Sequence, residues 1–211
     1  MIDMLLLWAT APDQALAQGV LAYGSWALGL VALVVFAETG LVVAPFLPGD
    51  SLLFVTGAVV AASGYDPHAT VALLVGAALL GDGLNFAIGR RLGPWALARW
   101  QGRWPRPSHL QATQAWFARF GGWTIVLARF MPVLRTFAPF LAGVGRMPGA
   151  RFAAFNLLGA LAWVGALVYA GVWFGELPQV RTHLGLWSMV IVATSLTPLA
   201  WAALRRRSPG T

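Results

Sequence analysis

The sequence predicts an all-α membrane protein with four transmembrane helices and two opposed re-entrant helical hairpins, arranged as an inverted repeat. Of the 211 residues, 59% are hydrophobic and only 10% are charged, and the mean hydropathy is +0.72. A soluble domain is about a quarter charged, so a chain of this composition cannot cover a surface that faces water. Residues 1–211 are therefore predicted to form a single transmembrane domain.

Four apolar stretches are long enough to cross a bilayer at a rise of about 1.5 Å per residue. They are residues 19–37, 70–89, 152–175 and 184–204, and only the second contains an acid, Asp82. We expect each to be an ordinary transmembrane helix.

The N-terminal segment has two interpretations. Residues 4–8 are apolar, and Ala15-Leu16-Ala17 resembles a signal-peptide cleavage site. A signal peptide needs a positively charged start, whereas the only charge before the apolar run is Asp3. A short interfacial helix is therefore favoured, with a cleaved signal as the alternative.

Two further stretches, residues 38–62 and 121–145, have the length of a span but contain helix breakers and charges. These residues are Glu38, Pro45, Pro48, Gly49 and Asp50 in the first, and Arg129, Pro132, Arg135, Pro139 and Gly143 in the second. Proline removes a helical hydrogen bond, and broken backbone at membrane depth persists only where protein or a wet cavity surrounds it. Both stretches are therefore predicted to be re-entrant hairpins that turn at these prolines and glycines. Two kinked but complete spans are the alternative.

Two patterns indicate that the hairpins enter from opposite sides. The run Ala44-Pro45-Phe46-Leu47-Pro48-Gly49 is echoed by Ala138-Pro139-Phe140-Leu141-Ala142-Gly143, one copy in each broken stretch. Arginines gather in residues 90–120, 146–151 and 205–207, while the remaining loops between spans hold a single arginine. By the positive-inside rule the arginine-rich parts and both termini are predicted to be cytoplasmic. Opposed hairpins of this kind are found in many transporters.

Residues 90–120 interleave arginine with tryptophan and phenylalanine. Arginine suits anionic headgroups and indole suits the headgroup boundary, so this segment is predicted to lie at the cytoplasmic membrane interface. A plain cytoplasmic loop is the alternative.

Five charged residues fall inside the predicted membrane segments or at their edge: Glu38, Asp50, Asp82, Arg129 and Arg135. Each would cost about 2.5–3.5 kcal/mol at the bilayer centre if it were isolated, so we expect these groups to meet partners or water. A functional site is favoured over a purely structural ion cluster, because buried ion pairs stabilise poorly compared with apolar packing.

The chemistry of these residue types is narrow. Arginine stays protonated and offers a planar fork of donors suited to phosphate or carboxylate. Arginines that stay charged can bind an anion, and neighbouring acids can take up or release protons, so the combination suits an anion site coupled to protons. Asn85 lies three residues after Asp82 and shares its helix face, and Asn156 adds another polar group inside the membrane. Each amide equally suits a hydrogen bond between packed helices.

Three motifs, in order from residue 20 to residue 175, resemble the signatures of the DedA family of bacterial membrane proteins. The first is Glu38-Thr39-Gly40 with Pro45-Phe46-Leu47-Pro48-Gly49-Asp50. The second is Gly81-Asp82 with Asn85 and Ile88-Gly89-Arg90. The third is Arg129-Phe130 with Pro132, Arg135, Pro139 and Ala142-Gly143, followed by Phe155-Asn156, Gly159-Ala160 and Trp163.

The resemblance implies the fold of VTT-domain (SNARE-associated) proteins, in which two opposed hairpins lie inside a helical bundle, and a place in the bacterial cytoplasmic (inner) membrane. It also implies movement of lipid across that membrane, in several members recycling of undecaprenyl phosphate, with proton dependence proposed. The acids and arginines important in the family map onto Glu38, Asp50, Arg129 and Arg135.

The residues and the resemblance together predict a flippase that translocates a polyprenyl phosphate such as undecaprenyl phosphate, coupled to protons. Arg129 and Arg135 are expected to bind the phosphate and Glu38 and Asp50 to exchange protons, with a proton gradient in place of a cofactor or metal. The supporting residues are Asp82, Asn85 and Asn156. Membrane lipids and the polyprenyl phosphate are the expected partners, nucleic acid is not, and a homo-oligomer stays open.

Two other transport functions remain as alternatives: a general phospholipid scramblase, and a proton- or cation-coupled transporter of small solutes. An enzyme is disfavoured. The chain has no cysteine, and its three histidines, His68, His109 and His183, lie in predicted loops without the spacing of a catalytic or metal site.

Overall fold

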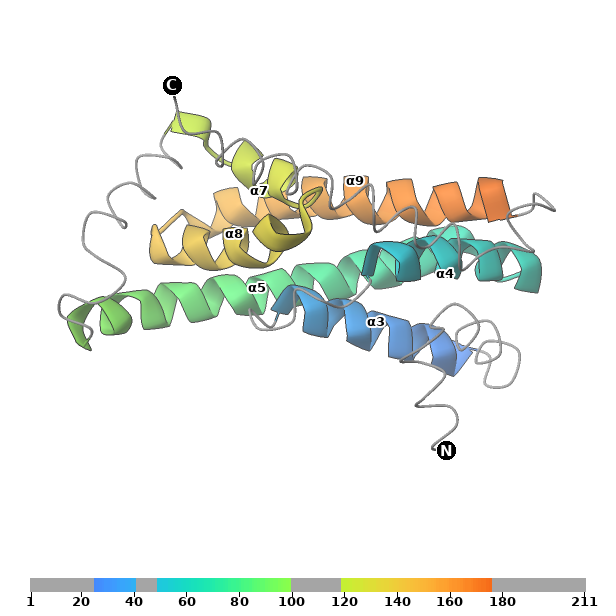
Figure 1. The fold of residues 1–211 in the computed structure, drawn as a ribbon, viewed down its shortest axis with the longest axis horizontal. Coiled ribbons are helices and arrows are strands. Elements are labelled where there is room, and N and C mark those ends of the chain that lie inside the picture. The colour runs from blue at the N-terminus through green and yellow to red at the C-terminus, as the bar shows by residue number, and fades with distance from the viewer. Residues whose placement is uncertain (1–24, 41–48, 100–118, 176–211) are drawn as a thin grey trace, which may run out of the picture. The chain divides into compact units, whose positions relative to one another are not determined.

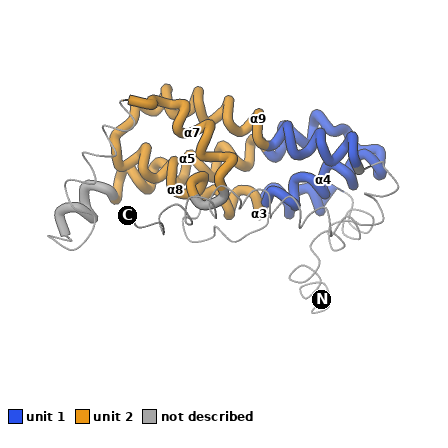
Figure 2. The backbone as a smooth tube through the Cα atoms, turned by 45° about the horizontal axis from the view of Figure 1, so that its top comes forward, with its two compact units in different colours: residues 1–33, 48–74, 164–211 blue, residues 34–47, 75–163 orange. Residues whose placement is uncertain are grey.

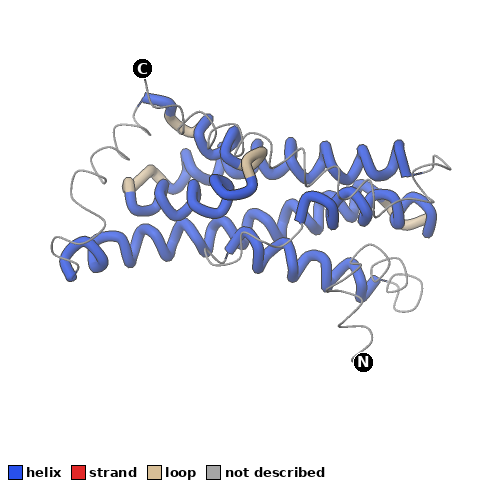
Figure 3. Tube along the Cα trace, in the orientation of Figure 1, coloured by secondary structure: helices blue, strands red, loops and turns tan. Residues whose placement is uncertain are grey.

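The computed structural model describes residues 25–40, 49–99 and 119–175. Every regular element in these ranges is a helix, and they contain no strand (Figure 3). The labelled helices are α3 (Ser25–Gly40), α4 (Gly49–Ser63), α5 (Pro67–Arg99), α7 (Trp123–Ala128), α8 (Pro132–Val144) and α9 (Gly149–Gly175) (Figure 1). The all-α prediction is confirmed for the described residues.

Two of these helices contain a stretch long and apolar enough to span a bilayer, Pro67–Leu92 in α5 and Gly149–Phe174 in α9. Helices α5 and α9 include the predicted spans 70–89 and 152–175. The described part of predicted span 19–37 lies in α3, which is apolar but only 16 residues long. The predicted span 184–204 lies outside the described residues, so the total of four spans stays a prediction.

Helix α5 extends further than predicted. The sequence places an interfacial segment from residue 90 onward, whereas the structure continues the helix to Arg99. The helix continues through Gly93 and Pro94, two residues that helix interiors disfavour, so neither the end of the apolar stretch nor these residues end it. Residues 100–118 of the predicted interfacial segment lie outside the described residues.

The predicted second hairpin, residues 121–145, consists of the short helix α7 and the helix α8, which pack against each other. The chain reverses between Arg129, which follows the last residue of α7, and Pro132, which begins α8. Proline is well suited to the first turn of a helix, where its missing N–H costs nothing. A helical hairpin is therefore present, and its entry into the membrane from one side stays a prediction.

Pro139 and Gly143 do not make the turn of this hairpin, contrary to prediction, because both lie inside α8. A Cβ atom on Gly143 would collide with the carbonyl oxygen of Phe86 in α5. This glycine is therefore required by close packing of α8 on α5 rather than by a change of chain direction.

The predicted first hairpin, residues 38–62, is divided between two helices. Glu38 lies in the last turn of α3, and Gly49 begins α4. Pro45 and Pro48 lie outside the described residues. Residues 49–60 of α4 are all buried, which is expected for a helix that is apolar on every side and enclosed by protein.

The chain divides into two compact units (Figure 2). Unit 1 contains residues 1–33, 48–74 and 164–211, and unit 2 contains residues 34–47 and 75–163. Helices α3, α5 and α9 contribute residues to both units.

In unit 1, the α4 and α9 backbones approach closely through two glycines. A Cβ atom on Gly57 would collide with the carbonyl oxygen of Val168, and one on Gly171 would collide with that of Phe54. Small residues allow membrane helices to gain backbone-to-backbone contact in the absence of a strong hydrophobic driving force.

In unit 2, one aromatic and aliphatic core joins α5, α7, α8 and α9. Phe86 of α5 stacks on Phe152 of α9, with ring centroids 4.2 Å apart and an interplanar angle of 10°. The other buried members of this core are Ile125, Ala128, Ala138, Ala142 and Met147. This packing positions the buried polar side chains of the unit.

The glycine contacts of unit 1 lead to a prediction for α9. Gly171→Ala should lower the melting temperature of the purified protein, because overpacking at a backbone contact typically costs about 1–3 kcal/mol. Gly165→Ala is the matched control on the same helix, since nothing lies within 4 Å of a Cβ at that position. The control should be neutral or stabilised, by up to about 1 kcal/mol of helix propensity. Equal destabilisation of both variants would contradict this packing.

Candidate functional site

Four of the five charged residues predicted to lie in the membrane come together in unit 2: Glu38, Asp82, Arg129 and Arg135. Each is buried, and none is more than 6% exposed. They come from four different parts of the fold: the end of α3, the middle of α5, the end of α7 and the first turn of α8.

Arg129 connects three helices of this unit. Its Nη2 donates a hydrogen bond to Asp82 Oδ2 of α5, forming a buried salt bridge. The same nitrogen donates to Asn156 Oδ1 of α9 at 2.5 Å. The guanidinium passes beside Gly159, where a Cβ atom would lie 2.9 Å from Arg129 Cδ. Gly159 therefore makes room for the arginine side chain.

Arg135 forms the second pair. Its Nη2 donates to Glu38 Oε1, joining α8 to the last turn of α3. Glu38 is brought to this position by close contact between α3 and α5, where a Cβ atom on Gly40 would lie 3.2 Å from the Cα of Gly81.

Asn85 supports the Arg135–Glu38 pair by binding the backbone on either side of it. Its Nδ2 donates to the carbonyl oxygen of Thr39 at 3.2 Å and to that of Thr136 at 2.7 Å. Thr39 directly follows Glu38, and Thr136 directly follows Arg135. The amide therefore binds α3 and α8 beside the two residues that form the salt bridge, and also satisfies a carbonyl at the C-terminus of α3.

The indole of Trp163 lies against both arginines. The Cζ atom of Arg135 is 4.8 Å from the ring centroid, and the Cζ atom of Arg129 is 5.8 Å from it. Trp163 is only 2% exposed. Cation–π contacts are worth about 2 kcal/mol or more when they are desolvated, so one ring interacts favourably with two cations that repel each other.

The charges of this cluster, Glu38, Asp82, Arg129 and Arg135, sum to zero, so it resides in an apolar bundle without a net buried charge. Its hydrogen bonding is incomplete: Arg129 Nε and Asn85 Oδ1 have no partner among the described residues. Such groups retain the capacity to bind water or a ligand. Chemically, the site offers two guanidinium forks for an oxyanion and two carboxylates that can take up protons.

Asp50, the fifth charged residue, lies in unit 1, buried in the first turn of α4. A carboxylate is favourable there because it faces the positive end of the helix dipole. The partner of Arg129 is Asp82, which the sequence had placed in a supporting role, and Asn156 joins the same group as expected of a polar residue inside the membrane.

Sequence reasoning assigned no role to Trp163 and Gly159. The signal was present in the spacing, because Asn156, Gly159 and Trp163 follow each other at i, i+3 and i+7 and so share one face of α9. The described residues contain no group of three or more histidine, cysteine, aspartate or glutamate side chains placed to hold a metal ion.

Several known proteins are similar in sequence to this chain over most of its length. The VTT domain pattern matches residues 47–172. Protein DedA of Escherichia coli (strain K12) is 45% identical over 188 residues, which cover 88% of this chain and 86% of that protein. An uncharacterized membrane protein of Mycobacterium tuberculosis (strain H37Rv) is 39% identical over 187 residues, covering 87% and 81%. Inner membrane protein YghB of Escherichia coli (strain K12) is 38% identical over 149 residues, covering 70% and 68%. No solved structure matches the chain significantly.

The pairing of Arg129 with Asp82 predicts strongly non-additive mutations. Asp82→Leu alone should destabilise the protein by about 3–5 kcal/mol, because it leaves an uncompensated buried arginine. Arg129→Met combined with Asp82→Leu should recover most of that loss, since an apolar replacement of both partners is often neutral. Unfolding of the single and double variants in detergent measures the coupling. Additive losses would show that the two side chains do not interact.

The position of Trp163 predicts an electronic effect on the arginines. Replacing it by tryptophans with increasing fluorination keeps the size of the ring while weakening its attraction for cations. Stability should therefore fall stepwise with each added fluorine. The same series at Trp173, which is 72% exposed, is the matched control and should leave stability unchanged. Equal responses at the two positions would mean that Trp163 acts by packing alone.

Proposed function

The chain belongs to the DedA family of VTT-domain membrane proteins, and from this premise we propose that it is a lipid transporter that carries a polyprenyl phosphate, such as undecaprenyl phosphate, across the bacterial cytoplasmic membrane. The observation that supports this proposal is the buried group of two arginines and two carboxylates in unit 2. Intramembrane charges of this kind usually belong to substrate or ion pathways.

Arg129 and Arg135 are the proposed phosphate ligands. A guanidinium binds two oxygens of a phosphate at once, and removal of water strengthens these charge-assisted bonds. Asp82 and Glu38 bind the same two guanidiniums in the structure. Phosphate and carboxylate are thus competitors for the same donors.

Protonation of the carboxylates would switch the arginines from binding carboxylate to binding phosphate. A carboxylate that takes up a proton loses its charge and its attraction for the arginine, which frees the guanidinium for the phosphate. The two arginines and two carboxylates sum to zero charge, so binding an anionic phosphate together with a matching number of protons keeps the site neutral. Glu38, Asp82 and Asp50 are the carboxyl groups proposed to take up these protons. This balance would avoid moving a net charge through the apolar bundle.

A carrier of this kind does no bond chemistry on the lipid, so we propose transport without a catalytic residue or a cofactor. The driving force would be the proton gradient. Both termini and the arginine-rich segments are proposed to face the cytoplasm.

Arg135→Lys tests the phosphate geometry. Lysine keeps the charge but acts as a point charge and cannot bind two phosphate oxygens at once. Loss of one charge-assisted hydrogen bond, about 1.5–3 kcal/mol, should slow transport roughly ten- to a hundredfold. The measurement is movement of labelled polyprenyl phosphate between leaflets of proteoliposomes. Arg119→Lys, the same substitution at an exposed position, should have no effect.

The same assay over a pH series tests the acids. Glu38→Gln and Asp50→Asn remove titrating groups and should flatten the pH dependence of transport. Wild-type protein that moves lipids with neutral headgroups equally fast, together with an Arg135→Lys variant indistinguishable from wild type, would contradict the proposal and establish a general scramblase instead.

A further inference from the structure

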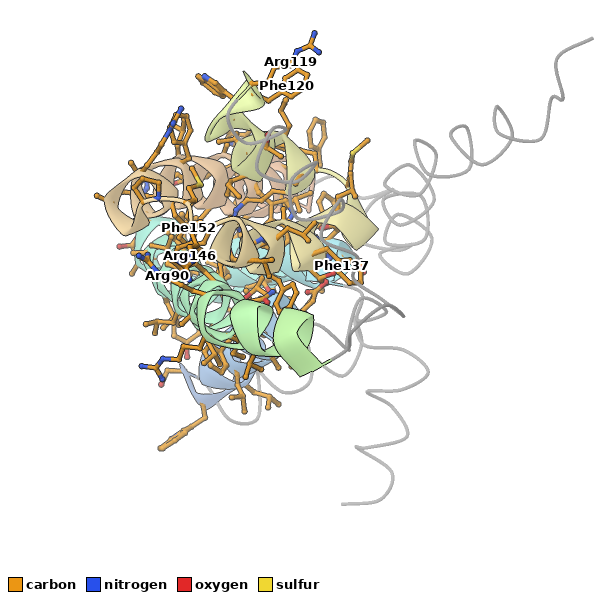
Figure 4. The ribbon with its side chains drawn as sticks, turned by 90° about the vertical axis from the view of Figure 1, so that its left-hand side faces the viewer. Arg90, Arg119, Phe120, Phe137, Arg146 and Phe152 are labelled. Atoms are coloured by element: carbon orange, nitrogen blue, oxygen red, sulfur yellow. The ribbon has the colours of Figure 1, made fainter. Side chains whose placement is uncertain are left out.

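Two arginines outside the buried ion pairs lie at one turn of unit 2, the turn between α8 and α9: Arg146 is part of the turn and Arg90 of α5 lies beside it. Arg90 and Arg146 are both exposed. A Cβ atom on Gly143 would lie 2.7 Å from the backbone nitrogen of Arg90, and one on Gly149 would lie 4.0 Å from Arg90 Nη1. Arg90 therefore borders this turn both before and after Arg146, and the two side chains lie on the same side of the unit (Figure 4).

The backbone at Arg146 adopts a conformation that arginine disfavours. Its φ angle is 55°, in the left-handed region where helices usually end with glycine. The N–H of Met147 donates to the carbonyl of Ala142 at 3.0 Å, and the N–H of Arg146 donates to that of Gly143 at 3.0 Å, so the turn is firmly closed. Residues held in such conformations cluster at binding sites. Here the result is an exposed arginine within the turn.

Arg90 is supported by aromatic rings. Its Cζ atom lies 5.9 Å from the ring centroid of Phe86, which in turn stacks on Phe152. Phe86 is only 8% exposed. The ring orders the arginine side chain while the guanidinium remains accessible, because a ring face offers no hydrogen-bond acceptor that would occupy its N–H groups.

The positive charge at this turn is not offset by an acid of the same unit. Unit 2 contains only two acidic residues, Glu38 and Asp82. Both are buried and already bound to Arg135 and Arg129. An anion from outside unit 2 is therefore the complementary partner for Arg90 and Arg146.

The depth of the turn identifies the source of that anion. In α5, Arg90 is the first charged residue after the uncharged run of residues 83–89, and α9 begins at Gly149, three residues after Arg146. Exposed leucines begin within three turns of the start of α9, where Leu157 is 44% exposed and Leu161 is 48% exposed. Exposed apolar surface of this kind marks contact with lipid chains, so the arginines stand at the level of the lipid phosphates.

We propose that Arg90 and Arg146 form a binding site for the phosphate of an anionic phospholipid headgroup. Two guanidinium forks suit phosphate oxygens, and basic sites between membrane helices bind anionic headgroups in this way. A lipid with a choline headgroup is disfavoured because its own cation repels the arginines. The site is separate from the buried ion pairs and does not depend on the transport proposal.

The test is thermal unfolding of the full chain in a neutral detergent, followed by the fluorescence of its 11 tryptophans. Phosphatidylglycerol should raise the melting temperature and phosphatidylcholine should not. Arg90→Gln and Arg146→Gly should each weaken the apparent affinity for phosphatidylglycerol by about tenfold, since each removes a charge-assisted hydrogen bond. Glycine accommodates the φ angle of residue 146, so the second variant should unfold at or above the wild-type temperature when no lipid is added.

Arg119→Gln is the matched control. It removes one exposed positive charge of the same unit, and Arg119 lies well away from Arg90 and Arg146 in Figure 4. This variant should respond to phosphatidylglycerol as the wild type does. If Arg119→Gln lost as much affinity for phosphatidylglycerol, the lipid effect would come from general surface charge, and the proposed site would be wrong. If glycerol 3-phosphate raised the melting temperature as much as the lipid does, the site would bind a soluble phosphate and the lipid proposal would be wrong.

Discussion

The pairing of two arginines with two carboxylates in an apolar environment is the constraint on which the arrangement of unit 2 depends. An isolated guanidinium or carboxylate at this depth would cost several kcal/mol, so each must meet its partner. Arg129 brings α7 to Asp82 of α5, and Arg135 brings α8 to Glu38 of α3. The pairs therefore determine which helices of the unit come together around the site.

Several neighbouring residues make these pairs feasible. Gly159 leaves space for the Arg129 side chain, and Asn85 binds the backbone beside both residues of the second pair. Trp163 adds a ring face that lies against both cations. Buried ion pairs stabilise less than apolar packing of the same volume, so this elaborate support is better explained by function than by stability alone.

The sequence predicted a good part of the fold and of the buried charged site. Composition indicated a helical membrane protein, and the charges inside apolar stretches identified Glu38, Asp82, Arg129 and Arg135 as residues that need partners. The combination of Arg129 with Pro132 also indicated the break between α7 and α8. Pro139 was misleading, because a proline in an apolar stretch marks either a turn or a tolerated helix interior, and only packing distinguishes the two.

The sequence by itself determined the helical class, the membrane character and the set of buried charges, because hydropathy and desolvation act on each residue wherever it lies. Which acid meets which arginine was decided only by the tertiary structure. Electrostatic attraction between charges has no sequence register, so the sequence assigned no acid to Arg129, and the packing of α5 against α7 brought Asp82 to it. The position of Arg90 beside the turn that carries Arg146 likewise depends on the glycine contact between α5 and α8.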